Sequence, residues 1–99
     1  MKKRAIFHPE AEAEFLAALT YYADRSSRVA ERFDAEIQRL VAQIETIPHR
    51  HGPWRHGTRR ARARKFPFII IFAERPKALF IVAIAHTKKH PDYWTERLS

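Results

Sequence analysis

Residues 30–48, AERFDAEIQRLVAQIETIP, carry the clearest structural signal in the chain. Apolar side chains recur there in steps of three and four, at Ala30, Phe33, Ile37, Leu40, Ile44 and Ile47. An α-helix turns once every 3.6 residues, so this spacing places them all on one face. Pro48 lacks a backbone N–H and cannot continue a helix. The stretch therefore predicts an amphipathic helix that ends at Pro48 and buries one face.

The residues before this stretch predict a first helix that runs antiparallel to it. Asp24-Arg25-Ser26-Ser27 interrupts the apolar pattern, and either serine can cap the helix that follows. Before the interruption, apolar residues again recur at helical spacing, at Ala11, Phe15, Ala18, Leu19 and Tyr22. Pro9 suits the first position of that helix, and residues 4–8, RAIFH, have the character of a short strand. The short connection predicts a helical hairpin whose two apolar faces pack on a common layer.

The residues after Pro48 predict a loop and then three strands. Residues 60–64, RARAR, alternate, so Arg60, Arg62 and Arg64 project from one face of a strand and the alanines from the other. Residues 68–72, FIIIF, and residues 79–85, LFIVAIA, are continuously apolar, which is typical of buried strands. The tail from residue 86 to residue 99 is polar and predicts a loop and a short final helix.

Together these elements predict an α+β fold with the order β-α-α-β-β-β. The economical arrangement is an N-terminal helical hairpin packed on one face of an antiparallel sheet, followed by a short C-terminal helix or tail. The other face of the sheet would be partly open, and we expect a binding surface there. With 99 residues, 45% of them hydrophobic, residues 1–99 are expected to form a single domain.

The composition restricts the kind of protein further. The chain has no cysteine, which excludes disulfides, thiolate zinc ligands and thiol nucleophiles. Six histidines are present, but we expect no metal and no cofactor, because the loop with His49, His51 and His56 has no cysteine or carboxylate ligand. No apolar run approaches the length of a membrane span, and glutamates soon follow the basic start. We therefore expect a cytoplasmic protein that binds no membrane and has no small-molecule substrate.

Charge is the most informative property of the composition. Nineteen Lys and Arg against eleven Asp and Glu give a net charge of +8. The excess is concentrated in residues 50–65, which contain no acidic residue. A solvated surface is the simplest explanation, but three arginines in register repel one another and a strand does not need them. We therefore interpret Arg60, Arg62 and Arg64, here called the basic row, as a contact for an acidic protein segment or a nucleic acid.

Several short motifs in a fixed order suggest a family. They are FHPEAE at 7–12, YY at 21–22, RF at 32–33, EI at 36–37, IP at 47–48, RKFPF at 64–68, VAIAHTKK at 82–89, PDYW at 91–94 and Arg97. In this order the chain resembles the RelE/ParE superfamily of toxins over nearly its whole length, and its ParE-like branch in particular. The resemblance implies a toxin of a type II toxin–antitoxin module, neutralised by a cognate antitoxin that wraps it through an amphipathic or extended segment.

The resemblance implies two possible targets. ParE-like toxins poison DNA gyrase, whereas RelE-like toxins cleave messenger RNA on the ribosome. As a ribonuclease the chain would use the basic row for charge, and His86, His90 or Tyr93 for proton transfer. RelE-like nucleases also carry an arginine directly after an aromatic residue early in the third strand, where this chain has Ile69 after Phe68. A second nuclease arginine falls near Thr87, where Lys88 or Lys89 could substitute.

The missing charge at Ile69 favours a gyrase inhibitor, which needs no catalytic residue. A ribosome-dependent endonuclease remains the alternative, a non-toxic nucleic-acid-binding module is the third hypothesis, and whether the chain is an enzyme stays open. For the gyrase inhibitor, the residues expected to contact the target or the antitoxin are Arg59, Arg60, Arg62, Arg64, Lys88, Lys89 and Arg97 as charges, and Tyr93 and Trp94 as anchors. Trp54 could stack on a base, although a tryptophan more often covers an edge of the core, and a tryptophan near a chain end, such as Trp94, is more often tucked against the sheet than exposed.

Overall fold

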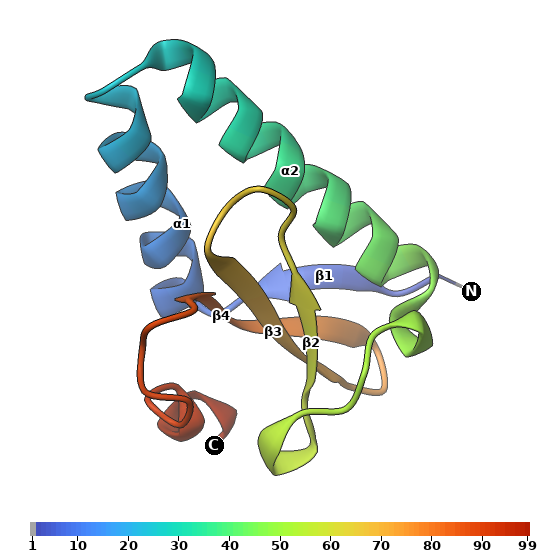
Figure 1. The fold of residues 1–99 in the computed structure, drawn as a ribbon. Helices are drawn as coiled ribbons and strands as arrows, with labels where there is room; N and C mark the ends of the chain where they lie inside the picture. Colours follow the sequence, from blue (N-terminus) through green and yellow to red (C-terminus); the bar gives the residue numbers. More distant parts are fainter. Residues whose placement is uncertain (1) are drawn as a thin grey trace.

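Two helices lie against one face of a four-stranded sheet in the computed structural model, which describes residues 2–99 (Figure 1). The elements are β1 (Arg4–Phe7), α1 (Pro9–Ala23), α2 (Ser27–Thr46), β2 (Arg59–Arg62), β3 (Phe68–Glu74) and β4 (Ala78–His86). Single turns of 3-10 helix lie at Pro48–Arg50, Arg55–Gly57 and Thr95–Leu98. The predicted α+β class and the order β-α-α-β-β-β are confirmed. No helix of the described part is both long enough and apolar enough to cross a membrane.

The sheet has the strand order β1-β4-β3-β2 and is mixed rather than antiparallel throughout. Strands β2, β3 and β4 pair antiparallel, but β1 pairs parallel to β4, with Arg4 opposite Ala78 and Phe7 opposite Ile81. The expectation of a wholly antiparallel sheet is therefore corrected for β1. Apolar alternation tells which face a residue occupies, but it carries no information on which strand lies alongside or in which direction.

Local signals explain where the helices begin. His8 caps α1, because its Nδ1 accepts a hydrogen bond from the Glu10 N–H at 3.0 Å, and Pro9 occupies the first helical position. Ser26 caps α2 by accepting from the Val29 N–H at 3.3 Å. Each cap satisfies a backbone donor that the first turn of a helix leaves unpaired. The connection between the helices is therefore short and fixed, and the hairpin forms as predicted.

The main core lies between the helices and the sheet. Ala30, Phe33, Ile37, Leu40 and Ile44 of α2 are buried as the spacing predicts, while Ile47 is half exposed beyond the last turn. Phe33 is fully buried and stands in an aromatic cluster with Phe15, Tyr22, Phe66 and Phe68, at centroid separations of 5.1–5.8 Å from each. The sheet contributes Ala61, Ile70, Phe72, Leu79, Ile81 and Ile84.

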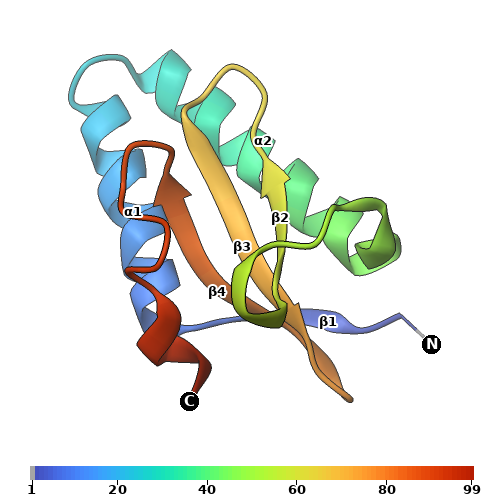
Figure 2. The same cartoon turned by 60° about the horizontal axis from the view of Figure 1, so that its bottom comes forward.

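A second, smaller cluster covers the face of the sheet opposite the helices, here called the open face. It joins Ile71, Ala73, Val82, Ala83 and Ala85 of the sheet to Trp94, with Trp54 packed at its side. Figure 2 shows this face, with residues 87–99, here called the C-terminal segment, beside β4, and with the loop before β2 lying across the sheet. The open face is thus partly closed by segments for which the sequence predicted only a loop and a tail.

Candidate functional site

Arg60 of the basic row lines the open face, and Arg62 is two residues further along β2 on the same side, as the alternation predicts. Ala61 and Ala63 point toward the helices and are almost fully buried, whereas Arg60, Arg62 and Arg64 are exposed. Strand β2 ends at Arg62, and the backbone N–H of Arg64, beyond it, donates to Glu36 Oε2 of α2 at 2.7 Å. In the described part of the chain, none of the three guanidinium groups forms an ion pair with a carboxylate. The row therefore presents positive charge that the protein itself does not pair.

Arg60 and Trp54 are stacked. The guanidinium carbon of Arg60 lies 3.9 Å from the centroid of the Trp54 ring. Both side chains line a hollow of about 230 Å³ on the open face, whose other lining residues are Ile69, Ile71, Ala85, His86, Thr87, Lys89, His90, Pro91, Tyr93 and Trp94. This set of residues is called the hollow below. It joins the basic row to the end of β4 and to the C-terminal segment.

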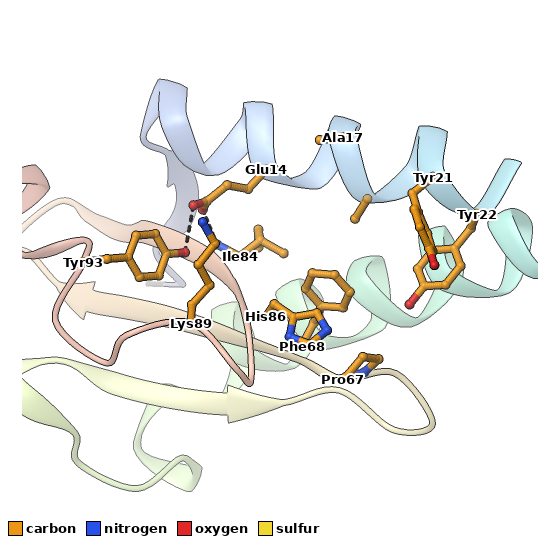
Figure 3. A pocket seen from close by; sticks show the side chains of 11 residues that line it. Glu14, Ala17, Tyr21, Tyr22, Pro67, Phe68, Ile84, His86, Lys89 and Tyr93 are labelled. Atoms are coloured by element: carbon orange, nitrogen blue, oxygen red, sulfur yellow. Dashed lines mark hydrogen bonds between the residues drawn. The ribbon is translucent and has the colours of Figure 1, made fainter. Parts of the chain in front are cut away.

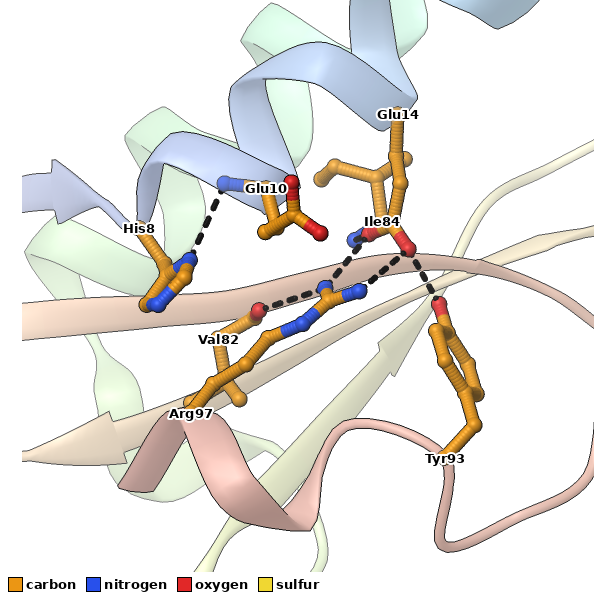
Figure 4. A network of polar contacts seen from close by, with 7 residues as sticks. All are labelled: His8, Glu10, Glu14, Val82, Ile84, Tyr93 and Arg97. Atoms are coloured by element: carbon orange, nitrogen blue, oxygen red, sulfur yellow. Dashed lines mark hydrogen bonds and ion pairs between the residues drawn. The ribbon is translucent and has the colours of Figure 1, made fainter. Parts of the chain in front are cut away.

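A carboxylate between α1 and β4 fixes the C-terminal segment (Figure 4). Glu14 Oε1 accepts from Arg97 Nη1 at 2.9 Å and from the Ile84 N–H at 3.0 Å. Glu14 Oε2 accepts from Arg97 Nη2 at 3.0 Å and from the Tyr93 hydroxyl at 2.7 Å. Arg97 Nη1 also donates to the Val82 carbonyl at 3.1 Å. These contacts are called the Glu14 clamp, and they join α1 to β4 and to the C-terminal segment, both of which are far from α1 in sequence.

The Glu14 clamp changes what Tyr93, Trp94 and Arg97 can do. The Arg97 guanidinium is neutralised inside the molecule, and Trp94 is only 1% exposed. Burial, followed by the hydrogen bond to Glu14, raises the pKa of the Tyr93 hydroxyl above its usual value. In this conformation Arg97 offers no free charge, Trp94 cannot serve as an exposed anchor, and Tyr93 is a poor proton donor. Trp94 and Arg97 therefore do not have the expected surface roles in this conformation, whereas the half-buried Tyr93 lines both the hollow and the groove described below.

The side chain of Arg59 also binds groups within the protein. Its Nη1 donates to the His51 carbonyl at 2.7 Å, and its Nη2 lies 3.3 Å from His49 Nδ1. It fixes the loop before β2 rather than extending from the sheet. Lys88 and Lys89, which follow β4, are exposed. Of the cationic residues predicted to bind a partner, Arg60, Arg62, Arg64, Lys88 and Lys89 remain on the surface.

The histidines expected to transfer protons make local contacts. His86 Nδ1 accepts from the Lys88 N–H at 3.1 Å, and His90 Nδ1 accepts from the Asp92 N–H at 3.1 Å. Both rings line the hollow. Ile69 lies in the same hollow, so the position at which the nucleases place an arginine holds an apolar side chain here. Within residues 2–99, no group of three His, Asp or Glu side chains is arranged to hold a metal.

A larger groove runs between α1 and the end of β4 (Figure 3). Its volume is about 640 Å³, with Glu14 and Tyr93 at one end and Tyr21 and Tyr22 at the other, while Phe68 and Ile84 lie between them. The groove exists because β1 pairs with β4 only up to Ile81, which leaves residues 82–86 without a neighbouring strand on that side. Most of its exposed surface is apolar.

Sequence reasoning missed both Glu14 and the groove. A usable signal existed for the first, because Glu14 lies three residues after Ala11 and four before Ala18, beside the apolar face of α1. A carboxylate at the border of a buried face needs partners, and the C-terminal segment provides them. The groove had no such signal, because it depends on how far β1 extends along β4.

A second set of polar contacts ties the loop before β2 to the C-terminal segment. Asp92 Oδ2 accepts from Arg55 Nη1 at 3.0 Å, and Asp92 Oδ1 lies 3.1 Å from His56 Nε2. His56 has a φ of 59°, a left-handed conformation that few non-glycine residues adopt, and its ring lies edge-on to Trp94. The two segments that cover the open face therefore support each other.

Comparison with known proteins identifies the family. The fold and its cationic open face define a small α+β protein, and the model of a family described as "ParE toxin of type II toxin-antitoxin system, parDE" matches residues 5–91. The chain belongs to this ParE toxin family. A solved chain described as "Chromosomal ParDE TA system from P. aeruginosa" has the same fold, with a TM-score of 0.73 and 19% identity over 86% of this chain and 96% of that one. No curated protein matches the chain in sequence.

Proposed function

We propose that the chain is a toxin that arrests growth by inhibiting DNA gyrase, and that a cognate antitoxin neutralises it in the cytoplasm. The observation that supports the proposal is that the hollow lacks two groups that the RelE-like nucleases use, an arginine after Phe68 and a free tyrosine hydroxyl. Ile69 occupies the position of a catalytic arginine, and the Tyr93 hydroxyl donates a hydrogen bond to Glu14. Cleavage of RNA needs stabilising charge on the phosphorane and a proton donor, whereas an inhibitor needs only a binding surface.

The contact with the target is assigned to the exposed cations of the open face. Arg60 and Lys89 line the hollow, Arg62 and Lys88 are exposed close to them in sequence, and Arg64 is exposed beyond the end of β2. A gyrase complex that holds DNA presents phosphates as well as acidic side chains, and both are attracted to this surface. The antitoxin is assigned to the groove between α1 and β4, where an apolar segment with acidic neighbours would meet Phe68, Ile84 and Lys89.

The gyrase proposal is tested by supercoiling with purified gyrase. We expect relaxed plasmid to remain relaxed, or cleaved DNA to accumulate, when the protein is added at stoichiometric amounts. Arg62→Glu should relieve the inhibition, whereas Arg28→Glu, an equal charge reversal on the exposed start of α2, should not. Unchanged supercoiling with the wild-type protein would contradict the proposal. Addition of the antitoxin should restore supercoiling.

The alternative is a ribosome-dependent endonuclease, and one observation favours it. His86 and His90 line the hollow together with Arg60 and Lys89, so groups able to move protons and groups able to bind phosphate share one site. This alternative predicts messages cut inside translated codons when the protein is expressed, and loss of the cuts in His86→Gln. Intact messages during growth arrest would exclude it.

A further inference from the structure

The hollow on the open face has the shape of a site for one planar ring. Its volume of about 230 Å³ is below the roughly 300–1,000 Å³ of pockets that enclose a drug-sized ligand. It lies between the C-terminal segment and strands β2, β3 and β4, and the exposed Arg60 is part of its lining. A larger ligand would therefore place one ring in the hollow, and the rest of the ligand would lie outside it.

The lining combines an apolar surface with aromatic side chains. Ile69, Ile71 and Ala85 of the sheet form its apolar part, and Trp54 and Tyr93 are contributed by two segments that lie far apart in the sequence. Stacking on aromatic side chains contributes about 1–3 kcal/mol for each base of a single strand, whatever the base. The Glu14 and Asp92 contacts hold the aromatic residues of the C-terminal segment in place before any ligand arrives.

The charges around the hollow are those that a phosphate backbone requires. Arg60 and Lys89 belong to the lining, and the exposed Arg62 and Lys88 lie close to each of them in sequence. None of the described lining residues is acidic. A ligand that carries a negative charge on each side of a ring would therefore meet Arg60 with one charge and Lys89 with the other.

Arg60 is already oriented for such a ligand. Its guanidinium lies over Trp54 at 3.9 Å, and across residues 2–99 its side chain donates no hydrogen bond to another residue. A stacked guanidinium keeps its N–H edges free, and those edges fit phosphate oxygens in a fork. The cation and the aromatic ring thus form one preorganised unit.

From this arrangement we propose that the hollow binds one base of a single-stranded nucleic acid, with the flanking phosphates on Arg60, Arg62 and Lys89. A duplex does not fit this description, because its bases are stacked inside, whereas a single strand offers them to aromatic side chains. An acidic peptide would satisfy the cations but would leave the apolar and aromatic lining unused. The proposal concerns the isolated protein and does not depend on which enzyme is the target.

The test is fluorescence anisotropy with a short labelled oligothymidylate and an oligouridylate, each with an abasic strand of equal length as competitor. We expect both strands to bind, which shows a common site, and a preference for one of them identifies DNA or RNA as the natural source. The abasic strand should compete about tenfold less well, the reduction expected for one base stack. Equal competition by the abasic strand or by polyglutamate would overturn the proposal, because charge alone would then explain binding.

Variants locate the site. Arg60→Glu should weaken binding about tenfold and reduce the steepness of the salt dependence by about 0.7 for each phosphate that the variant no longer binds. Arg28→Glu, which changes the net charge equally, should leave both unchanged. Trp54→Ala should weaken binding about tenfold, while Trp54→Phe retains most of it and reduces the quenching of tryptophan emission by the strand to what Trp94 contributes. Circular dichroism checks that each variant is folded, and equal weakening by Arg28→Glu and Arg60→Glu would overturn the assignment.

Discussion

The two faces of the sheet are covered in different ways. The helix-covered face is closed by apolar side chains at regular spacing, and Phe33, Ile37 and Ile44 reach complete burial there. The open face is closed by two irregular segments that are held by ionic hydrogen bonds, chiefly those of Glu14 and Asp92. The first kind of contact stabilises the fold, whereas the second positions residues that surround the hollow. A substitution on the helix-covered face should therefore lower the stability of the whole fold, whereas one on the open face should loosen only the segments around the hollow.

The largest effect is expected on the helix-covered face. Phe33→Ala removes the ring that contacts Phe15, Tyr22, Phe66 and Phe68, and it should lower the free energy of unfolding by about 3–5 kcal/mol. Much of the stability of a domain of this size would disappear. Urea unfolding measures the change. Leu16→Ala, at a position 51% exposed on α1, is the control and should change stability by less than about 0.5 kcal/mol.

A smaller and more local effect is expected from the Glu14 clamp. Glu14→Gln keeps the size of the side chain but leaves Arg97, whose side chain is 13% exposed, without its counter-charge, and should cost about 2 kcal/mol. Amide hydrogen exchange should speed up in the C-terminal segment and remain slow in α2. Glu12→Gln, on the exposed side of α1, is the matched control. If exchange rose equally in both regions, the two faces would not be separable.

The smallest effect concerns pH and His51. The Nε2 atom of His51 is buried and has no hydrogen-bond partner among residues 2–99. Burial, followed by the charges of Arg50, Arg39 and Arg59, lowers the pKa of its imidazole. The folded state thus favours neutral His51, so this part of the stability is complete above the ordinary pKa of 6.5 and is lost as pH falls below it.

Urea unfolding at about pH 7.5 and at about pH 5.5 tests this dependence. The wild-type protein should be less stable at the lower pH, and His51→Leu should lose less stability than the wild type over the same interval. Because His51 lies edge-on to Phe72 on the helix-covered face, the hydrogen exchange of the C-terminal segment should not follow the difference. Parallel pH profiles of the two proteins would contradict the prediction.

The sequence predicts the helix-covered face well because the apolar spacing that defines it lies within single helices and strands. The spacing of Ala30, Phe33, Ile37, Leu40 and Ile44 defines a helix and its buried face without knowledge of the rest. The alternation of residues 60–64 likewise indicates that Arg60 and Arg62 share the exposed side of β2, since a strand alternates whatever its neighbours are, but Arg64 lies beyond the end of the strand.

The open face could not be predicted to the same depth, because its contacts join residues that are far apart. Glu14 and Arg97 are separated by 83 positions and Arg55 and Asp92 by 37, and no periodicity links either pair. A motif could show that Tyr93, Trp94 and Arg97 occur together, but not that Trp94 is buried or that Tyr93 and Arg97 bind Glu14. The parallel pairing of β1 was missed for the same reason.

The interrupted pairing of β4 has a consequence for aggregation. Beyond Ile81 the strand would offer free backbone groups to any passing chain, which is how sheets of separate molecules join. Glu14 occupies the Ile84 N–H and Arg97 the Val82 carbonyl, so an intruding strand must first displace an ion pair. At the opposite margin β2 carries arginines that repel a second copy of themselves. A sheet of only four strands is thereby kept from growing at either side.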